Sequence, residues 1–174
     1  RERRALPWVR IDKDYVFDAP EGRRKLADLF DGRRQLLVQH FMLAPGWEQG
    51  CKSCSYMADH NDAANVHLAQ RDVTLLAISR APLAEIERFR KRMGWQFKWV
   101  SSHGTDFNHD FCAGITEEEQ REGGFEYNYV REKPFKPPVE KAGTPPSGEI
   151  LFARMTGTDV ATYTRERPGM SAFL

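Results

Sequence analysis

The chain has 174 residues, a length typical of one domain that buries about 70% of the surface exposed by its unfolded form. Hydrophobic residues make up 40% and charged residues 29%, and 26 Lys and Arg against 25 Asp and Glu leave a net charge of +1. This balance excludes an intrinsically disordered chain. Acids offset the short basic runs, so we expect no nucleic-acid partner.

The apolar segments are short. The longest, residues 36–44, is interrupted by Gln39 and His40 and is far from the roughly 20 residues of a membrane span. The first residues are charged and lack the apolar core of a signal peptide. We therefore expect a cytoplasmic protein without a membrane partner. Three cysteines, an odd number, cannot form a closed disulfide framework, so we expect them to serve chemistry or packing.

The first part of the chain alternates predicted strands and helices. The polar cluster at 12–14 predicts an N-terminal hairpin over 8–17, and helical spacing predicts a short helix over 25–30. Buried strands are predicted over 35–43 and 72–79, a helix over 53–70, a second helix from 79–82 to Gly94, and a strand over 97–101. Short connections between these elements predict parallel crossovers and an α/β sheet with helices on both faces.

The rest of the chain is less regular. Residues 115–148 hold an acidic run and five prolines, which predict a long surface excursion around one strand over 125–130. Alternation over 150–155 and 160–164 predicts a closing hairpin. Only residues 168–174 then remain, enough to begin a helix but too few to complete one.

A Cys-x-x-Cys pair is the strongest chemical feature. Cys51 and Cys54 follow a predicted buried strand and begin a predicted helix, and the chain has no nucleotide, phosphate-loop, metalloprotease or serine-hydrolase motif. The spacing lets the two sulfurs meet, and the free N–H groups at the helix start favour a thiolate at Cys51. Lys52 adds a nearby cation. We expect Cys51 to attack a disulfide and Cys54 to resolve it, at a helix tip beside an open groove.

Two other interpretations of the pair remain open. The same spacing forms half of a zinc site, which Cys112 and one of four histidines could complete: His60, His67, His103 and His109. Alternatively, both cysteines could be buried packing residues. The position between strand and helix favours dithiol chemistry over a zinc-binding or protein-interaction module.

Several segments carry a family resemblance. They are PGWEQGCKSC (45–54), VTLLAISRAPL (73–83), MGW (93–95), and WVSS (99–102) through DFN (106–108). Together they resemble a bacterial thioredoxin-like family of predicted dithiol-disulfide oxidoreductases, and the likeness covers nearly the whole chain. The resemblance implies one thioredoxin-like domain over residues 1–174, of the peroxiredoxin-like variant. It also implies exchange with a protein or small-molecule disulfide and no bound organic cofactor.

The sequence departs from better-known relatives around the pair. Trp47, which we expect to wall the site, stands four residues before Cys51, where thioredoxins place tryptophan directly before the first cysteine. Lys52-Ser53 replaces their Gly-Pro. Glu48 stands where peroxiredoxins carry threonine, and an acid there opposes a thiolate, so a peroxidase is the weaker expectation. Pro146 is the nearest candidate for the cis-proline that thioredoxins place before a late strand.

A polar cluster at 106–112 offers further site residues. Asp106, Asn108 and His109 could line the dithiol cleft, with His109 carrying a proton. The alternative is a loop whose Asp and Asn side chains bond their own backbone, with Cys112 as a small buried hydrophobe.

The end of the chain bears on assembly. Thioredoxin-like folds usually finish with a helix over one face of the sheet, and here that helix is short or missing. An uncovered apolar face predicts either a truncated chain or a partner subunit, so a homodimer is expected as one way to cover it.

Overall fold

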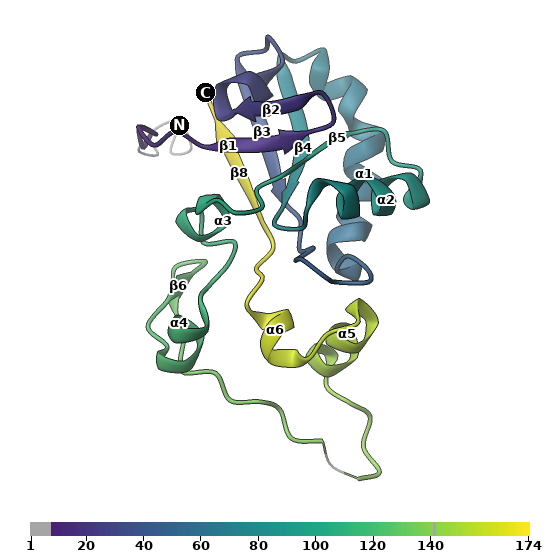
Figure 1. Cartoon of the computed structure of the whole chain (residues 1–174), viewed down its shortest axis with the longest axis vertical. Coiled ribbons are helices and arrows are strands. Elements are labelled where there is room, and N and C mark those ends of the chain that lie inside the picture. Colours follow the sequence, from purple (N-terminus) through teal and green to yellow (C-terminus); the bar gives the residue numbers. More distant parts are fainter. Residues whose placement is uncertain (1–7, 141) are drawn as a thin grey trace.

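The computed structural model describes residues 8–140 and 142–174 and centres on a six-stranded sheet in the order β2-β1-β5-β4-β3-β8 (Figure 1). The strands are β1 (Val16–Ala19), β2 (Gly22–Lys25), β3 (Gln35–His40), β4 (Val73–Ser79), β5 (Lys98–Ser101) and β8 (Gly169–Phe173), with β6 (Glu126–Tyr127) and β7 (Val130–Arg131) in a separate hairpin. The helices are the 3-10 helix η2 (Leu26–Phe30) and the α-helices α1 (Lys52–Ala69), α2 (Leu83–Met93), α3 (Phe107–Asp110), α4 (Glu117–Glu122), α5 (Gly148–Thr156) and α6 (Val160–Thr164).

The centre of the sheet is parallel, as predicted. Strand β3 pairs with β4 in the register Leu37↔Leu75, and β4 pairs with β5 in the register Ala77↔Trp99. Near-continuous apolar runs form these strands because both of their faces are covered. The predicted strands at the centre and the long helices α1 and α2 are confirmed. Gly94 ends α2 in the left-handed conformation, with φ 77°.

Two core clusters lie on opposite faces of the sheet. Helices α1 and α2 cover one face and bury Ala58, Ile86, Phe89 and the two cysteines against Trp99. On the other face, η2 and α3 bury Leu29 and Phe107 against strand side chains that include Phe17, Val38, Ile78 and Val100. Helices therefore flank both faces of the central sheet, although the second face is covered only by short ones.

The N-terminal hairpin lies further along the chain than predicted. Strands β1 and β2 pair over 16–25, in the register Ala19↔Gly22, and Gly22 takes φ 108° at the turn. The predicted hairpin over 8–17 is wrong. Its polar cluster does not form a hairpin turn, and Lys13 instead forms ion pairs with Asp106 and Asp110.

The predicted hairpin over 150–164 is also wrong, because two helices form there. The Ser147 hydroxyl accepts a hydrogen bond from the N–H of Ile150 and starts α5, and Gly157 ends it with φ 76°. The Asp159 carboxylate then accepts from the N–H of Thr162 and starts α6. These cap residues outweigh the apolar alternation of the two segments.

The last residues form an edge strand instead of beginning a helix. Strand β8 runs antiparallel to β3, with Leu36 opposite Phe173 and His40 opposite Gly169. Figure 1 shows this strand (yellow) returning from α6 along the sheet. The edge of β3 is thus paired within this chain, and homodimer formation stays a prediction.

The excursion between β5 and α5 holds more structure than predicted. The acidic run forms α4, started by a capping box in which the Thr116 hydroxyl accepts from the N–H of Glu119 and the Glu119 carboxylate accepts from the N–H of Thr116. The predicted strand over 125–130 is a hairpin, β6–β7. It turns at Asn128 and Tyr129, whose φ angles are 51° and 63°.

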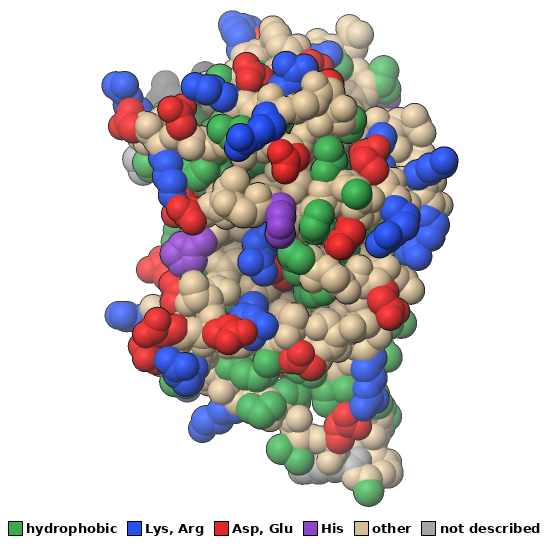
Figure 2. Space-filling model, in the orientation of Figure 1, with side chains coloured by type: hydrophobic (Ala, Val, Ile, Leu, Met, Phe, Trp, Pro, Cys, Tyr) green, Lys and Arg blue, Asp and Glu red, His purple; other side chains and the backbone are tan. Residues whose placement is uncertain are grey.

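The exterior carries charges of both signs. Lys and Arg side chains are interspersed with Asp and Glu over the face shown in Figure 2. Among the described residues, no helix has both the length and the apolar character that crossing a membrane requires.

Candidate dithiol site

Cys51 and Cys54 lie at the start of α1, directly after the loop that follows β3. Cys51 is the N-cap residue of the helix, and its N–H donates to the Met42 carbonyl over 3.0 Å. Its own carbonyl accepts from the N–H of Ser55 over 2.9 Å. The two cysteines come within 3.9 Å of each other and are free thiols. The helix start therefore places the two free cysteines next to each other.

Both cysteines are buried, which differs from the open groove expected from the sequence. Each is only 3% exposed. The side chains packed in the same cluster include Phe41, Trp47 and Tyr163. Tyr163 comes from α6, which the sequence placed in a strand, so the site's cover could not be anticipated. Aromatic side chains therefore cover the two sulfurs.

The structure makes Cys51 the more acidic thiol of the pair. Its pKa is lowered to about 5, first by a hydrogen bond from the Cys54 thiol and then by the Tyr163 phenol. The N–H groups of Cys54 and Ser53 lower it further, as expected at a helix start. These donors outweigh burial, which opposes the charge. Cys51 is therefore suited to be the thiolate at neutral pH.

Cys54 behaves in the opposite way. Its pKa is raised well above the ordinary value, because its thiol proton is held in the hydrogen bond to Cys51 and because it is buried. These opposite shifts favour a pair with one proton, held by Cys54, and the negative charge on Cys51. The two shifts run in the directions that an attacking Cys51 and a resolving Cys54 would need, and these roles stay a prediction.

An aromatic stack closes the site. The rings of Trp47 and Tyr163 lie 5.5 Å apart with an interplanar angle of 16°, and the Tyr163 hydroxyl lies 3.2 Å from Cys51 Sγ. Trp47 Nε1 is buried and, among the described residues, lacks a hydrogen-bond partner. Trp47 is buried in the same cluster as the two cysteines, and it stacks on a residue that the sequence did not indicate.

Helices α5 and α6, residues 148–164, form a unit that we call the cap. The N–H of Glu48 donates to the Thr156 carbonyl over 3.0 Å, which ties the cap to the loop before Cys51. The Glu48 side chain lies against Gly157, where an added Cβ would come within 2.7 Å of its Cγ. Glu48 is thus a docking residue for the cap.

Apart from the Ser53 N–H, the remaining predicted site residues make the contacts that follow with groups other than the two sulfurs. Lys52 is exposed and donates to Gln49 Oε1 over 3.1 Å, while Ser53 contributes its N–H to Cys51. The other contacts join three residues to partners elsewhere: Asp106 to Lys13, Asn108 to the Ser102 hydroxyl, and His109 to Glu119. The structure therefore brings Trp47, Lys52 and Ser53 to the dithiol region, and it ties residues 106–109 to the strands and helices around them.

The geometry does not assemble the alternative zinc site. Over residues 8–140 and 142–174, no group of three or more His, Cys, Asp and Glu side chains gathers in a way that could hold a metal. The His60 ring bonds the Tyr56 carbonyl within its own helix. Cys112, which we expected to be a buried hydrophobe, is exposed, and it has φ 53° in the turn after α3.

The proline before the late strand is Pro168, not Pro146. Pro146 lies just ahead of α5, whereas Pro168 directly precedes β8, the strand antiparallel to β3. Among the described residues no peptide bond is cis. The error follows directly from reading α5 as a strand.

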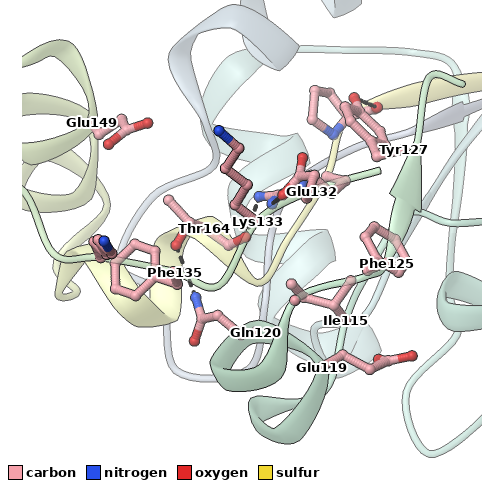
Figure 3. A pocket seen from close by; sticks show the side chains of 14 residues that line it. Ile115, Glu119, Gln120, Phe125, Tyr127, Glu132, Lys133, Phe135, Glu149 and Thr164 are labelled. Carbon is pink, nitrogen blue, oxygen red and sulfur yellow. Dashed lines mark hydrogen bonds and ion pairs between the residues drawn. The ribbon is translucent and has the colours of Figure 1, made fainter. Parts of the chain in front are cut away.

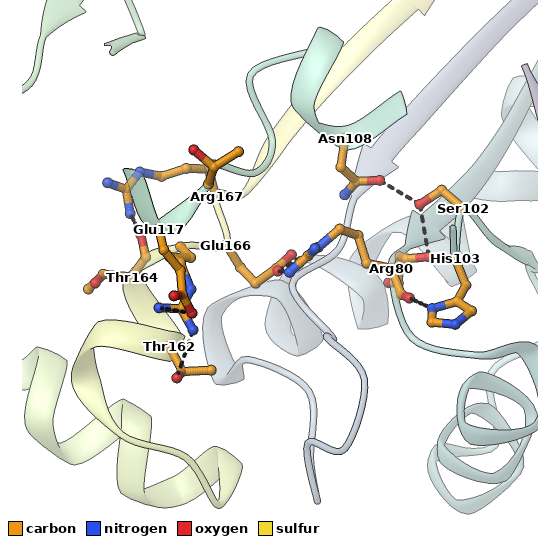
Figure 4. Close-up of polar contacts among 12 residues, drawn as sticks. Arg80, Ser102, His103, Asn108, Glu117, Thr162, Thr164, Glu166 and Arg167 are labelled. Carbon is orange, nitrogen blue, oxygen red and sulfur yellow. Dashed lines mark hydrogen bonds and ion pairs between the residues drawn. The ribbon is translucent and has the colours of Figure 1, made fainter. Parts of the chain in front are cut away.

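A buried ion pair and a cavity lie near the cap. Arg80, at the end of β4, donates to Glu166 through Nε over 2.7 Å and through Nη2, and Glu166 is only 2% exposed (Figure 4).

A cavity of about 440 Å³ lies between α4, the β6–β7 hairpin and the cap (Figure 3). Tyr127, in its wall, donates to the Pro168 carbonyl over 2.5 Å. These contacts fix the segment between α6 and β8.

Three solved structures are similar to this chain. The peroxidoxin BcpB from Mycobacterium tuberculosis matches with a TM-score of 0.50 and 15% identity, over 60% of this chain and 64% of its own. A PrxQ variant from Xylella fastidiosa matches with a TM-score of 0.48 and 13% identity, over 64% and 71%. The hypothetical protein SMc02350 from Sinorhizobium meliloti 1021 matches with a TM-score of 0.47 and 18% identity, over 94% and 91%.

The first of these matches shows a thioredoxin-like fold of the peroxiredoxin-like kind, as the sequence resemblance implied, although this chain spans less than two thirds of that protein. No curated protein matches the chain. A family model matches residues 1–174 throughout and is described as a bacterial protein of unknown function, DUF899. The chain therefore belongs to this bacterial family.

Proposed function

We propose that the protein is a thiol-disulfide oxidoreductase that works through Cys51 and Cys54. One observation carries the proposal: two free thiols 3.9 Å apart at a helix start, with the pKa of one lowered to about 5 and that of the other raised. Two cysteines that only filled the core would not need thiols with such different pKa values. Perturbed pairs of this kind are typical of functional sites.

The reaction follows from the protonation states. The Cys51 thiolate attacks one sulfur of a substrate disulfide, forms a mixed disulfide and releases the other sulfur as a thiolate. Cys54 then loses its proton and attacks Cys51 Sγ, which releases the second substrate thiolate. The protein ends with a Cys51–Cys54 disulfide, the substrate ends as two thiols after taking up two protons, and two electrons have passed between them.

Access is part of the proposal because both sulfurs are covered. The cap contacts the dithiol region through Tyr163 and the Glu48–Thr156 hydrogen bond, so a large disulfide requires the cap to move. A small disulfide requires a smaller displacement of the aromatic wall. We propose that large substrates enter by displacement of the cap from the loop over residues 44–50.

The test is the reduction of a small-molecule disulfide by the pre-reduced protein, followed as released thiol. Cys51→Ser should lose activity, and Cys54→Ser should stop at a mixed disulfide of one substrate half with Cys51. Cys112→Ser is the matched control, since this exposed cysteine lies outside the pair. Equal rates for the wild type and Cys51→Ser would refute the proposed function.

A further inference from the structure

Tyr163 joins the dithiol from a distant part of the chain. Its hydroxyl lies 3.2 Å from Cys51 Sγ, although the two residues are 112 positions apart in the sequence. Tyr163 is buried, and its N–H donates to the Asp159 carbonyl over 2.9 Å inside α6. The stack on Trp47 fixes the plane of its ring. The phenol is therefore held in place against the sulfur by packing on several sides.

The direction of this hydrogen bond follows from the charges. Burial raises the pKa of Tyr163, and the hydrogen bond to Cys51 raises it further, so the phenol keeps its proton. A Cys51 thiolate has no proton to give. The O–H of Tyr163 therefore donates to Cys51 Sγ, and a donor to an ionised sulfur stabilises the charge.

We propose that Tyr163 is a catalytic residue of the dithiol site, whose hydroxyl holds the negative charge on Cys51 and so selects Cys51 over Cys54 as the attacking sulfur. This inference rests on the proposed function. No proton leaves Tyr163 during the reaction. As the Cys51–substrate bond forms, charge moves from Cys51 Sγ to the departing sulfur, and the hydroxyl loses its charged acceptor.

The hydrogen bond has two opposite effects on rate. It increases the fraction of Cys51 present as thiolate, and it lowers the intrinsic reactivity of each thiolate, because nucleophilicity falls with thiol pKa. At low pH the first effect dominates, and at high pH only the second remains. A residue with a merely structural role would not produce this reversal.

The experiment compares Tyr163→Phe with wild type in the rate of Cys51 attack on a small disulfide, measured across the pH range of thiol ionisation. Loss of one charge-assisted hydrogen bond should move the midpoint of the profile up by about one pH unit. With a Brønsted coefficient near one half, the variant should be about threefold slower below the midpoint and about threefold faster well above it. The two profiles should therefore cross.

Tyr127→Phe is the matched control. It removes a phenol of the same kind, which bonds the Pro168 carbonyl instead of a cysteine, and its profile should overlay the wild type. A fluorinated tyrosine at position 163, with a more acidic phenol of nearly the same size, should shift the midpoint downward. This second variant keeps the test available even where Tyr163→Phe folds poorly.

The outcomes separate the two claims. If the wild-type protein reacts through Cys51 and both Tyr163 variants keep its midpoint, the role of Tyr163 is refuted while the dithiol function stands. If the wild-type pair does not react with disulfides at all, the proposed function itself fails. A uniform change in rate at every pH would assign Tyr163 a structural role and overturn the inference.

Discussion

Trp47 and Tyr163 stack across the dithiol, with ring centroids 5.5 Å apart and an interplanar angle of 16°. One ring belongs to the loop before Cys51 and the other to the cap, so this contact joins the reactive cysteine to the last helices of the chain. Because the two rings come from these two parts of the chain, displacing the cap from the loop would separate them. The environment of Cys51 and the access to it are therefore linked through one aromatic pair.

The docking of the cap can be weakened at Gly157. A Cβ added there would lie 2.7 Å from Glu48 Cγ, and the φ of 76° is unfavourable for alanine. We expect Gly157→Ala to displace the cap and to increase the rate at which a bulky thiol reagent labels Cys51 in the native state. Mass analysis of the labelled peptide measures that rate.

Gly94→Ala separates backbone strain from the steric contact. Gly94 also ends a helix with positive φ, at 77°, but an added Cβ meets nothing within 4 Å. Gly94→Ala should therefore lower the free energy of unfolding by about 1 kcal/mol and leave Cys51 labelling unchanged. Equal labelling in the two variants would show that the cap does not control access.

Stability should fall in acid because of His40. This histidine is buried at the end of β3, and burial lowers its pKa from 6.5 to about 4. The folded state therefore binds the proton more weakly than the unfolded state. The stabilisation is complete above pH 6.5 and is lost as the pH falls toward 4, an effect of about 3 kcal/mol for such a shift.

Denaturant unfolding across this pH range checks the effect, with His40→Gln as the comparison. Glutamine does not titrate, so the difference in the free energy of unfolding between wild type and variant should shrink as the solution is acidified. The His40 ring also bonds the Ser171 hydroxyl over 2.8 Å, which sets a constant part of that difference. A difference independent of pH would contradict the assignment to His40.

The Arg80–Glu166 pair should respond unequally to loss of its two members. Glu166 is 2% exposed, whereas the Arg80 side chain is 40% exposed. Arg80→Met leaves a buried carboxylate without its partner and should cost about 3 kcal/mol of unfolding free energy. Glu166→Gln leaves a guanidinium that water can reach, so its cost should be smaller.

The pH dependence of Arg80→Met gives a second check. Burial already raises the pKa of Glu166, and removal of Arg80 takes away the charge that lowers it. A raised carboxyl pKa means that the folded state binds the proton more strongly, so the variant should recover stability as the pH falls toward 5. Equal losses for both variants, or no recovery in acid, would contradict this account.

The central sheet could be predicted because local and global preferences agree there. The apolar runs of β3 and β4 fit only buried strands, and the spacing of Ile86 and Phe89 with Gly94 at the end fits only a capped helix. Cys51 and Cys54 could be placed for the same reason, since the pair falls between a strand and a helix with clear boundaries.

The cap could not be predicted, and with it Tyr163 was missed. Residues 150–155 and 160–164 alternate like strands, and their helical state depends on the caps Ser147 and Asp159 and on packing against Trp47. The available indications were Ser147 and Asp159 at the two helix starts and Gly157 between the helices. Contacts between residues more than a hundred positions apart carry no local pattern that a single sequence could show.

The direct test of the account is whether Cys51 and Cys54 form a disulfide with each other and return to thiols. The reduced protein is treated with mild oxidant and then with reductant. The mass of the peptide that contains both cysteines is measured by mass spectrometry at each stage. We predict that it loses the mass of two hydrogens on oxidation, regains it on reduction, and does so equally in Cys112→Ser. A pair that stays reduced, or that oxidises only beyond the disulfide to sulfinic acid, would contradict the dithiol mechanism.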